Sequence, residues 1–197
     1  MVASAQKSYL TPEEYLQLEQ SSEIKHEYFD GEIYAMAGAT DTHVTIAGNI
    51  FALLLANSRG SGCRVFISDM KVRIEAKNRF FYPDVMVTCE AEDRENTTYK
   101  KFPCLIIEVL SDSTEAFDRG DKFADYQLIP SLQEYVLINT KKARLECFRR
   151  TEDNLWLLQF YELDKINFEL SSIGFSGKIE DVYQEVEFSP AKDSTNQ

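Results

Sequence analysis

The pattern of apolar and polar positions divides the first part of the chain into two helices with a hairpin between them. A helix is expected over Thr11–Ser22, because a hydroxyl residue precedes proline and a glutamate follows at the third helical position. The dipeptide Asp30-Gly31 separates two aromatic-rich runs and predicts a β-hairpin within Lys25–Met36. A second, well-buried helix is expected over Asp41–Ser58, with its first residue as the cap.

Strand patterns dominate the rest of the chain. Strands are expected at Arg64–Ile67, Lys71–Ile74, Phe81–Cys89, Cys104–Leu110, Glu134–Asn139, Arg144–Arg149 and Leu155–Tyr161, the last three as an antiparallel meander. Between them, Ala91–Lys101 is expected to be a polar loop and Thr114–Leu128 a helix that Pro130 stops. Ile173–Phe175 is expected to add a strand and Ile179–Val182 a helical turn. This order predicts an α+β domain with a mixed sheet.

The composition is that of one globular domain. The chain has 197 residues, of which 44% are hydrophobic and 27% charged, enough for a sizeable core. We expect one domain over 1–197 with its core at about 11–185 and flexible ends at 1–9 and 190–197. No apolar run approaches the roughly 20 residues of a membrane helix, and Met1–Ser8 has no apolar centre of a signal peptide. No membrane partner is expected.

Charge and cysteine content narrow the choice of function and compartment. The net charge of −12 argues against a protein that coats nucleic acid through a basic surface. It is compatible with a nuclease that has a local basic cleft and a metal held by carboxylates. The four cysteines, Cys63, Cys89, Cys104 and Cys147, form no C-x-x-C pair. They are expected to be free thiols in a reducing, cytoplasmic compartment, without structural zinc.

Glu108 is the one charge in the apolar run Cys104–Leu110. A buried carboxylate is costly unless a cation or a metal ion pairs with it. Asp84 follows Tyr82-Pro83 and opens the strand before, so the two acids meet if these strands are neighbours. With Lys122 from the following helix they provide what metal-dependent phosphodiester cleavage requires: metal ligands and a positive charge near the phosphate.

Asp118, Lys122 and Tyr126 are spaced so that they share one helical stripe. On that stripe Asp118 can orient the lysine ammonium and Tyr126 can pack or hydrogen-bond behind it. Two other interpretations stay open at this point: a solvated Asp–Lys pair on the helix surface, and a structural salt bridge for the strand glutamate. His43, at a helix entry, has a cap or packing role as its default and a substrate-side role as the alternative.

Four segments together form a more specific pattern. They are Tyr82-Pro83-Asp84-Val85, Pro103-x4-Glu108-Val109-Leu110-Ser111, Asp118-x3-Lys122-x3-Tyr126 and Pro130-Ser131-Leu132-x-Glu134-Tyr135. This pattern resembles the bacterial "putative restriction endonuclease" family of the PD-(D/E)xK nuclease superfamily. The resemblance runs from about Thr11 to Arg150 and includes Glu27–Gly31, Met36 and His43.

The resemblance implies a restriction-endonuclease-like α+β (α/β) fold, with a central mixed β-sheet flanked by α-helices. It also implies an endodeoxyribonuclease that hydrolyses DNA with Mg²⁺ (or Mn²⁺). It assigns Asp84 and Glu108 as metal ligands, with Glu27, near the end of the first helical region, in support. The superfamily lysine is absent from its usual position, where this chain has Leu110, and Lys122 matches a version in which that lysine has moved to the next helix. A homodimer is expected because double-strand cutters often pair two sites. The alternatives are a catalytically silent nucleic-acid- or protein-binding module on the same fold, and a hydrolase of small phosphoesters.

Overall fold

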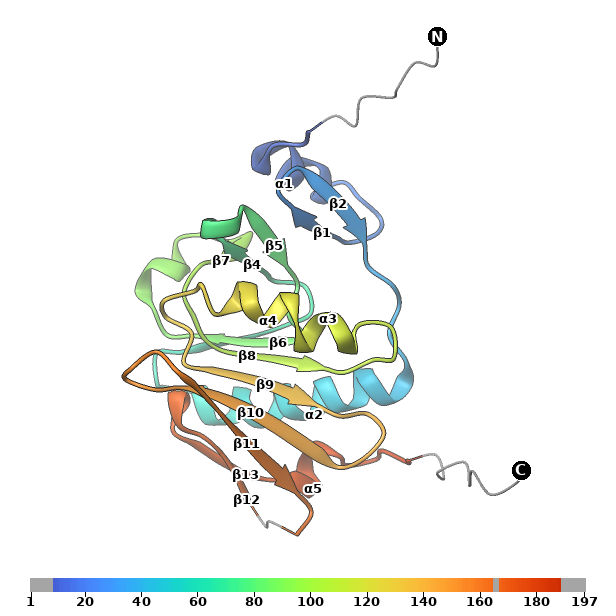
Figure 1. The fold of residues 1–197 in the computed structure, drawn as a ribbon, viewed down its shortest axis with the longest axis vertical. Helices are drawn as coiled ribbons and strands as arrows, with labels where there is room; N and C mark the ends of the chain where they lie inside the picture. The colour runs from blue at the N-terminus through green and yellow to red at the C-terminus, as the bar shows by residue number, and fades with distance from the viewer. Residues whose placement is uncertain (1–8, 165–166, 189–197) are drawn as a thin grey trace, which may run out of the picture.

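A six-stranded mixed sheet forms the centre of the fold (Figure 1). The computed structural model describes residues 9–164 and 167–188. In spatial order the strands are β11 (Trp156–Glu162), β10 (Arg144–Arg150), β9 (Glu134–Ile138), β8 (Pro103–Val109), β6 (Val85–Thr88) and β3 (Arg64–Ile67). The β8–β9 pair is parallel and the other pairs are antiparallel. The expected mixed sheet and the meander of its last three strands are therefore present.

A second sheet of five strands lies beside the first. Its order is β2 (Glu32–Ala35), β1 (His26–Phe29), β5 (Arg79–Phe81), β4 (Lys71–Ile74) and β7 (Tyr99–Lys100). A further hairpin joins β12 (Asn167–Leu170) and β13 (Phe175–Lys178). The turn between β1 and β2 is the predicted one, since Asp30 and Gly31 have φ angles of 42° and 99°, as a two-residue hairpin turn requires.

Helices cover both faces of the six-stranded sheet. The helices are α1 (Pro12–Glu19), α2 (Asp41–Ser58), α3 (Glu115–Arg119), α4 (Asp121–Tyr126) and α5 (Ile179–Val182), and the short 3₁₀ helices are η1 (Glu75–Lys77), η2 (Ala91–Arg94) and η3 (Ser171–Ile173). The Thr11–Glu14 capping box of α1 forms as predicted, whereas the N-cap of α2 is Thr40 rather than Asp41. Among the described residues, no helix combines the length and hydropathy needed to cross a bilayer.

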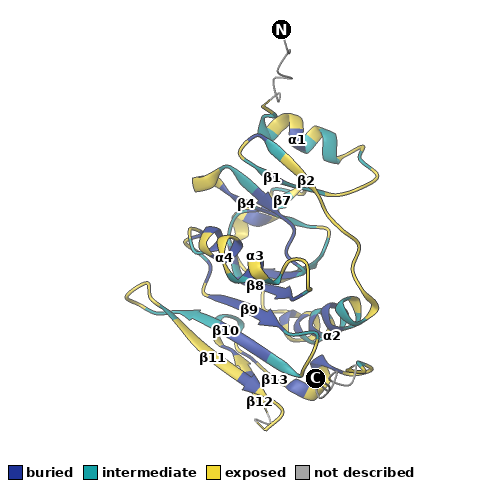
Figure 2. Cartoon of the chain, turned by 45° about the vertical axis from the view of Figure 1, so that its right-hand side comes forward, coloured by how far each residue is buried: buried dark blue, intermediate teal, exposed yellow. Residues whose placement is uncertain are grey.

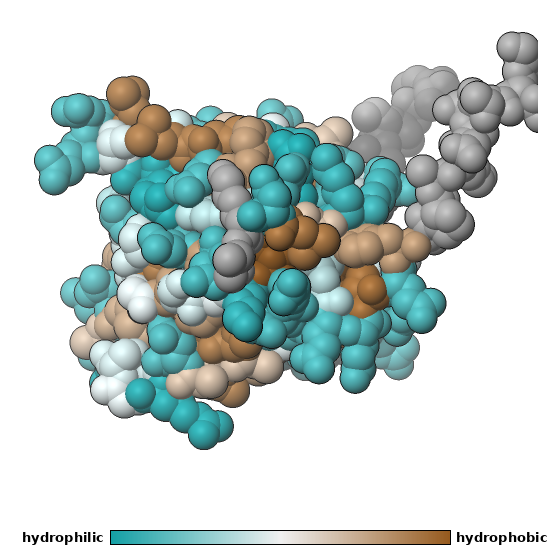
Figure 3. Space-filling view, turned by 90° about the horizontal axis from the view of Figure 1, so that it is seen from below, coloured by the Kyte–Doolittle hydropathy of each residue, from teal (hydrophilic) through white to brown (hydrophobic). Residues whose placement is uncertain are grey.

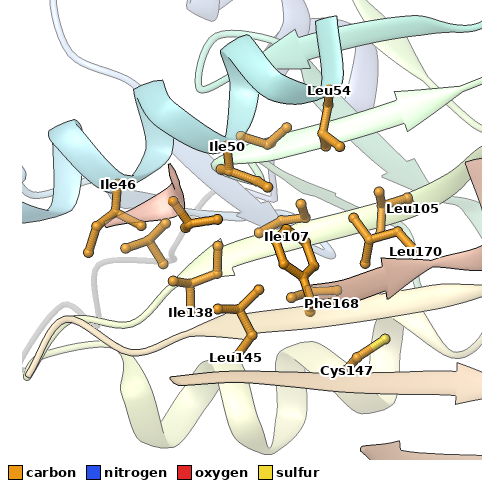
Figure 4. Close-up of a cluster of buried hydrophobic side chains, with 14 of the residues drawn as sticks. Ile46, Ile50, Leu54, Leu105, Ile107, Ile138, Leu145, Cys147, Phe168 and Leu170 are labelled. Carbon is orange, nitrogen blue, oxygen red and sulfur yellow. The ribbon is translucent and has the colours of Figure 1, made fainter. Parts of the chain in front are cut away.

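The period-two alternation of β8 separates two hydrophobic clusters. Ile107 and Val109 pack with α2, including Ile50, whereas Ile106 and Leu110 face α4 on the other side. Figure 4 shows the α2 residues pointing at the β8–β10 side chains, and Figure 2 shows the central strands as the dark, buried part of the chain. Glu108 therefore projects into the cluster on the α4 side, as its spacing from Ile106 predicts.

Several element boundaries differ from the sequence prediction. The Thr114–Leu128 helix is interrupted at Gly120, where a Cβ would lie 3.1 Å from the carbonyl oxygen of Ala116. The Phe81–Cys89 strand is split at Pro83, which has no N–H for a ladder, so β5 and β6 belong to different sheets. The strand expected at Ile173–Phe175 begins only at Phe175, as β13, because Ile173 ends η3 and Gly174 has a φ of 59°. The polar Ala91–Lys101 segment contains η2 and β7. The ends expected to be flexible lie outside the described residues, Tyr9 excepted.

Cys63 and Cys89 form a disulfide, which corrects the expectation of four free thiols. Arg64 pairs with Thr88 in the β3–β6 ladder, so the preceding and following cysteines are opposite each other, with Cα atoms 4.0 Å apart. Cys104 and Cys147 are free. The cytoplasmic location stays a prediction, without the support that free cysteines gave it.

Removing this disulfide is expected to lower the free energy of unfolding by about 3.5 kcal/mol. The bond closes a loop with a sequence separation of 26, and chain entropy gives roughly that stabilisation for such a loop. Urea unfolding of Cys63→Ser/Cys89→Ser against the oxidised protein measures it. Cys104→Ser is the control, and an equal midpoint for all three proteins would contradict the prediction.

Candidate active site

Asp84 and Glu108 lie side by side because β6 runs antiparallel to β8. The register pairs Val85 with Ile107, so Asp84 lies opposite Glu108. The backbone N–H of Asp84 donates to Glu108 Oε2 at 3.3 Å, and the N–H of Val109 donates to Asp84 Oδ2 at 2.8 Å. Each acid is thus fixed by the backbone of the other strand, and both side chains lie at the same end of the sheet.

Lys122 brings a buried positive charge to these acids. Its Nζ lies 2.9 Å from Glu108 Oε1 and 3.4 Å from both Glu27 Oε1 and Asp118 Oδ1. Only 7% of the Lys122 side chain is exposed, so the solvated Asp–Lys pair on the helix surface is wrong. Glu27 comes from β1 rather than from the end of a helical region.

Two tyrosines hold the buried side of the site. Tyr126 donates its hydroxyl hydrogen to Glu108 Oε1 at 2.8 Å, and Tyr135 donates to the carbonyl oxygen of Asp118 at 2.9 Å. Tyr135 was not among the predicted site residues, although it lies in the last of the four motif segments. The Lys122 ammonium also lies 5.8 Å from the ring centroid of Phe81, within reach of a cation–π contact. Phe81 was also not predicted as a site residue, and its only sequence signal is its place beside the Tyr82-Pro83-Asp84 segment.

His43 joins the site from the first turn of α2. Its Nε2 lies 3.2 Å from Asp84 Oδ2. Burial lowers the pKa of His43, but the hydrogen bond and charge of Asp84 and the backbone of Val109 outweigh burial and raise it above the ordinary value. The cap role goes to the Thr40 hydroxyl, which accepts from the His43 backbone N–H, so the histidine ring is available to orient the carboxylate.

Burial and nearby charges set the protonation of Glu108 and Lys122. Burial raises the pKa of Glu108 to about 8, although the charge of Lys122 acts to lower it. For Lys122 burial acts in the opposite sense, but the carboxylates of Glu108, Glu27 and Asp118 outweigh it and the pKa is raised. The lysine is therefore charged at neutral pH, and the proton that the site can gain or lose is on the glutamate.

The Glu108 titration predicts a pH-dependent stability. Its folded pKa is above that of the unfolded chain, so the folded protein binds more protons between about pH 4.5 and 8, and this carboxyl's contribution to stability is lost as pH rises through that window. Glu108→Gln cannot titrate there. As pH rises through this window, the free energy of unfolding of Glu108→Gln is expected to increase relative to that of the wild type. The increase is at most about 1.4 kcal/mol per pH unit. Urea unfolding at a series of pH values tests this, and parallel curves would contradict it.

The donor set suits a hard divalent cation. Asp84 and Glu108 offer adjacent carboxylate oxygens, and Mg²⁺ is usually held by one or two carboxylates with water and phosphate oxygens completing its shell. The described residues contain no group of three or more His, Cys, Asp or Glu side chains arranged to hold a metal ion. A cation here would take two protein carboxylates and its remaining ligands from solvent or substrate.

Two further acidic residues, Asp69 and Glu134, pair with cations other than Lys122. Asp69 is 80% exposed and pairs with Lys25. Glu134, part of the motif pattern, is fully buried and binds Arg149 and the backbone and hydroxyl groups of Ser171 and Ser172. It ties η3 to the central sheet and does not contact the Asp84–Glu108 pair.

Known proteins resemble this chain in sequence and in fold. The family model named Uma2 and described as "Putative restriction endonuclease" matches residues 12–180. "Uncharacterized protein slr1290" of Synechocystis sp. (strain ATCC 27184 / PCC 6803 / Kazusa) is 40% identical over 179 residues, 91% of this chain and 94% of its own length. "Uncharacterized protein sll1609" of the same organism is 38% identical over 160 residues, 80% of this chain and 90% of its own.

A solved structure shares the fold. The crystal structure of "a putative nuclease belonging to DUF820" from Anabaena variabilis ATCC 29413 matches with a TM-score of 0.72, covering 88% of this chain and 97% of its own. At 16% identity this likeness concerns the fold alone. It confirms the predicted α+β architecture.

Proposed function

The chain belongs to the Uma2 family, described as "Putative restriction endonuclease", and from this membership we propose that it is a metal-dependent endodeoxyribonuclease of the PD-(D/E)xK type. Its substrate is DNA, its reaction is hydrolysis of phosphodiester bonds, and its cation is Mg²⁺ or Mn²⁺. The proposal takes the whole chain as one nuclease-like domain with its core at about residues 11–185.

The observation that carries the proposal is the convergence of Asp84, Glu108 and Lys122. Two carboxylates and one ammonium lie within hydrogen-bonding distance of one another or of the adjoining backbone. The lysine of the superfamily motif is absent from its usual position, two residues after the glutamate. Lys122 reaches the site from α4 instead. Its 2.9 Å contact with Glu108 supports the view that the helix supplies the lysine of the motif.

Each side chain has a role that follows from its contacts. Asp84 and Glu108 would hold the cation, which when bound would lower the pKa of water and offset charge at the phosphate. Lys122 places a fixed positive charge where negative charge develops on the phosphorane oxygens. Asp118 and Glu27 position that ammonium from two other elements. Tyr126 holds Glu108 and His43 holds Asp84, so the two carboxylates stay oriented.

Cleavage of supercoiled plasmid by the purified protein tests the proposal. Nicked or linear DNA is expected with Mg²⁺ or Mn²⁺, and none with EDTA or with Asp84→Asn. Asp69→Asn is the matched control, because this carboxylate is exposed and pairs with Lys25 rather than with Lys122. Equal cleavage by wild type and Asp84→Asn would indicate a contaminant and reject the assignment.

A binding module without turnover is the second candidate, favoured by the net charge of −12, which is unusual for a protein that relies on phosphate contacts. A gel shift of DNA, or capture of a protein, that is insensitive to EDTA, together with no cleavage by any variant, would select it.

The proposal includes a homodimer, since double-strand cutters often pair two sites. Support comes from β11, which lies at one end of the six-stranded sheet and exposes Leu157 and Leu158 by 63% and 43%. Apolar (brown) side chains gather in patches among polar ones on the face seen in Figure 3. Sedimentation at micromolar concentration is expected to give a dimer that Leu157→Glu/Leu158→Glu converts to monomer. A wild-type monomer would reject it.

A further inference from the structure

A cavity lined by arginines lies at the opposite end of β6 from the carboxylates. It has a volume of about 610 Å³, and its lining includes Arg59, Arg64, Arg94 and Ser58. Arg64 pairs with Thr88 at the last residue of β6, whereas Asp84 precedes the first. At the rise of a β-strand these positions are roughly 13 Å apart. The cavity is therefore separate from the candidate active site.

The three guanidinium groups are not neutralised by ion pairs. Within residues 9–164 and 167–188 none of them takes part in a salt bridge, whereas Arg79, Arg119 and Arg149 each pair with a buried carboxylate. The buried acid that precedes Arg94 in the sequence has other partners: Asp93 accepts from the Thr88 hydroxyl and from the backbone N–H groups of Lys101 and Phe102. Three arginines at one cavity without an ion pair in the described part of the chain are notable when the net charge is −12.

Ser58 gives an independent indication that the cavity takes a polar ligand. The residue is 6% exposed, and its hydroxyl is buried with no hydrogen-bond partner among the described residues. Buried hydroxyl groups normally have a partner. A ligand oxygen in the cavity would supply one.

The arginine-bearing segments are fastened to each other. Arg94 donates to the carbonyl oxygen of Gly62 at 2.8 Å, and the Cys63–Cys89 disulfide joins the loop before β3 to the segment before η2. The cavity wall is thus held in place before a ligand arrives, which reduces the entropy lost on binding.

We propose that this cavity binds a phosphate group. Guanidinium forks match the tetrahedral oxygens of phosphate, and a hydroxyl donor completes such a shell. The group can come from free phosphate or from a DNA backbone phosphate distant from the one that is cut. The DNA source rests on the proposed function and the free anion does not.

Calorimetric titration with inorganic phosphate, in EDTA, tests the site with no requirement for metal or cleavage. Arg59→Gln/Arg64→Gln is expected to bind at least about tenfold more weakly than wild type, and Ser58→Ala to weaken binding by a smaller factor. Lys141→Gln/Lys142→Gln is the control, since it also removes two positive charges, but from the exposed turn after β9. This variant is expected to bind phosphate like wild type.

A short DNA duplex, titrated in EDTA by fluorescence anisotropy, identifies the source. A parallel loss of duplex and phosphate affinity in the arginine variant supports a DNA backbone phosphate. A loss of phosphate affinity alone supports a free anion. Equal phosphate binding by the arginine variant and the lysine control, or no binding to wild type, overturns the proposal whether or not the protein cleaves plasmid.

Discussion

Glu108→Gln is expected to lower the rate of DNA cleavage by about 10³-fold or more while the protein stays folded. The amide has nearly the shape of the carboxylate and can still accept hydrogen bonds from Tyr126 and Lys122 at Oε1. It cannot supply the negative charge that a divalent cation needs, and loss of one such electrostatic contribution costs about 10²–10³ or more in rate. Initial rates of plasmid nicking at saturating Mn²⁺ and at pH 8.5 provide the measurement.

The control for this variant is Glu162→Gln, a half-exposed glutamate at the end of β11 that pairs with Arg144. It is expected to cleave within about twofold of wild type, as is usual for a surface substitution. Cleavage by Glu108→Gln within tenfold of wild type would rule out a metal-ligand role for this carboxylate, provided that its thermal unfolding is cooperative.

Lys122→Met is expected to reduce both stability and cleavage. The substitution leaves Glu108, Glu27 and Asp118 without the cation that lies within 3.4 Å of each. Removing one partner of a buried ion pair costs about 3–5 kcal/mol of stability. The cost is expected to shrink below pH 8, because the Glu108 carboxyl, whose pKa is about 8, then becomes neutral. Urea unfolding at pH 6 and pH 8.5 measures the difference.

Loss of the ammonium is also expected to slow cleavage by about 10²–10³-fold. Lys122→Arg separates the two effects, since it keeps the charge and most of the stability but changes the position of the donors. Lys142→Met is the matched control on an exposed lysine. If Lys122→Met unfolded like wild type at both pH values and cleaved DNA at an undiminished rate, the lysine would have no part in the site.

Local signals in the sequence predicted the elements that depend on neighbouring residues. The capping box at Thr11–Glu14 and the Asp30-Gly31 turn formed as predicted because their interactions lie within four residues of the chain. The alternation along β8 likewise placed Glu108 on the face of Ile106, since the two faces of a strand follow from its period alone.

The sequence by itself also determined which side chains could carry the chemistry: one acid in an apolar strand, one acid after Pro83, and one lysine on the next helix. Only the tertiary structure decided that they meet. That meeting depends on the antiparallel β6–β8 register and on α4 packing over β8, as do the placement of Glu27 on β1 and the approach of His43 from α2.

The Cys63–Cys89 bond and the arginine-lined cavity could not be predicted from the sequence for the same reason. Both join segments that are distant along the chain and carry no shared periodicity. Strand order and packing set such contacts, because the free energy that selects them is gained only when the whole sheet forms.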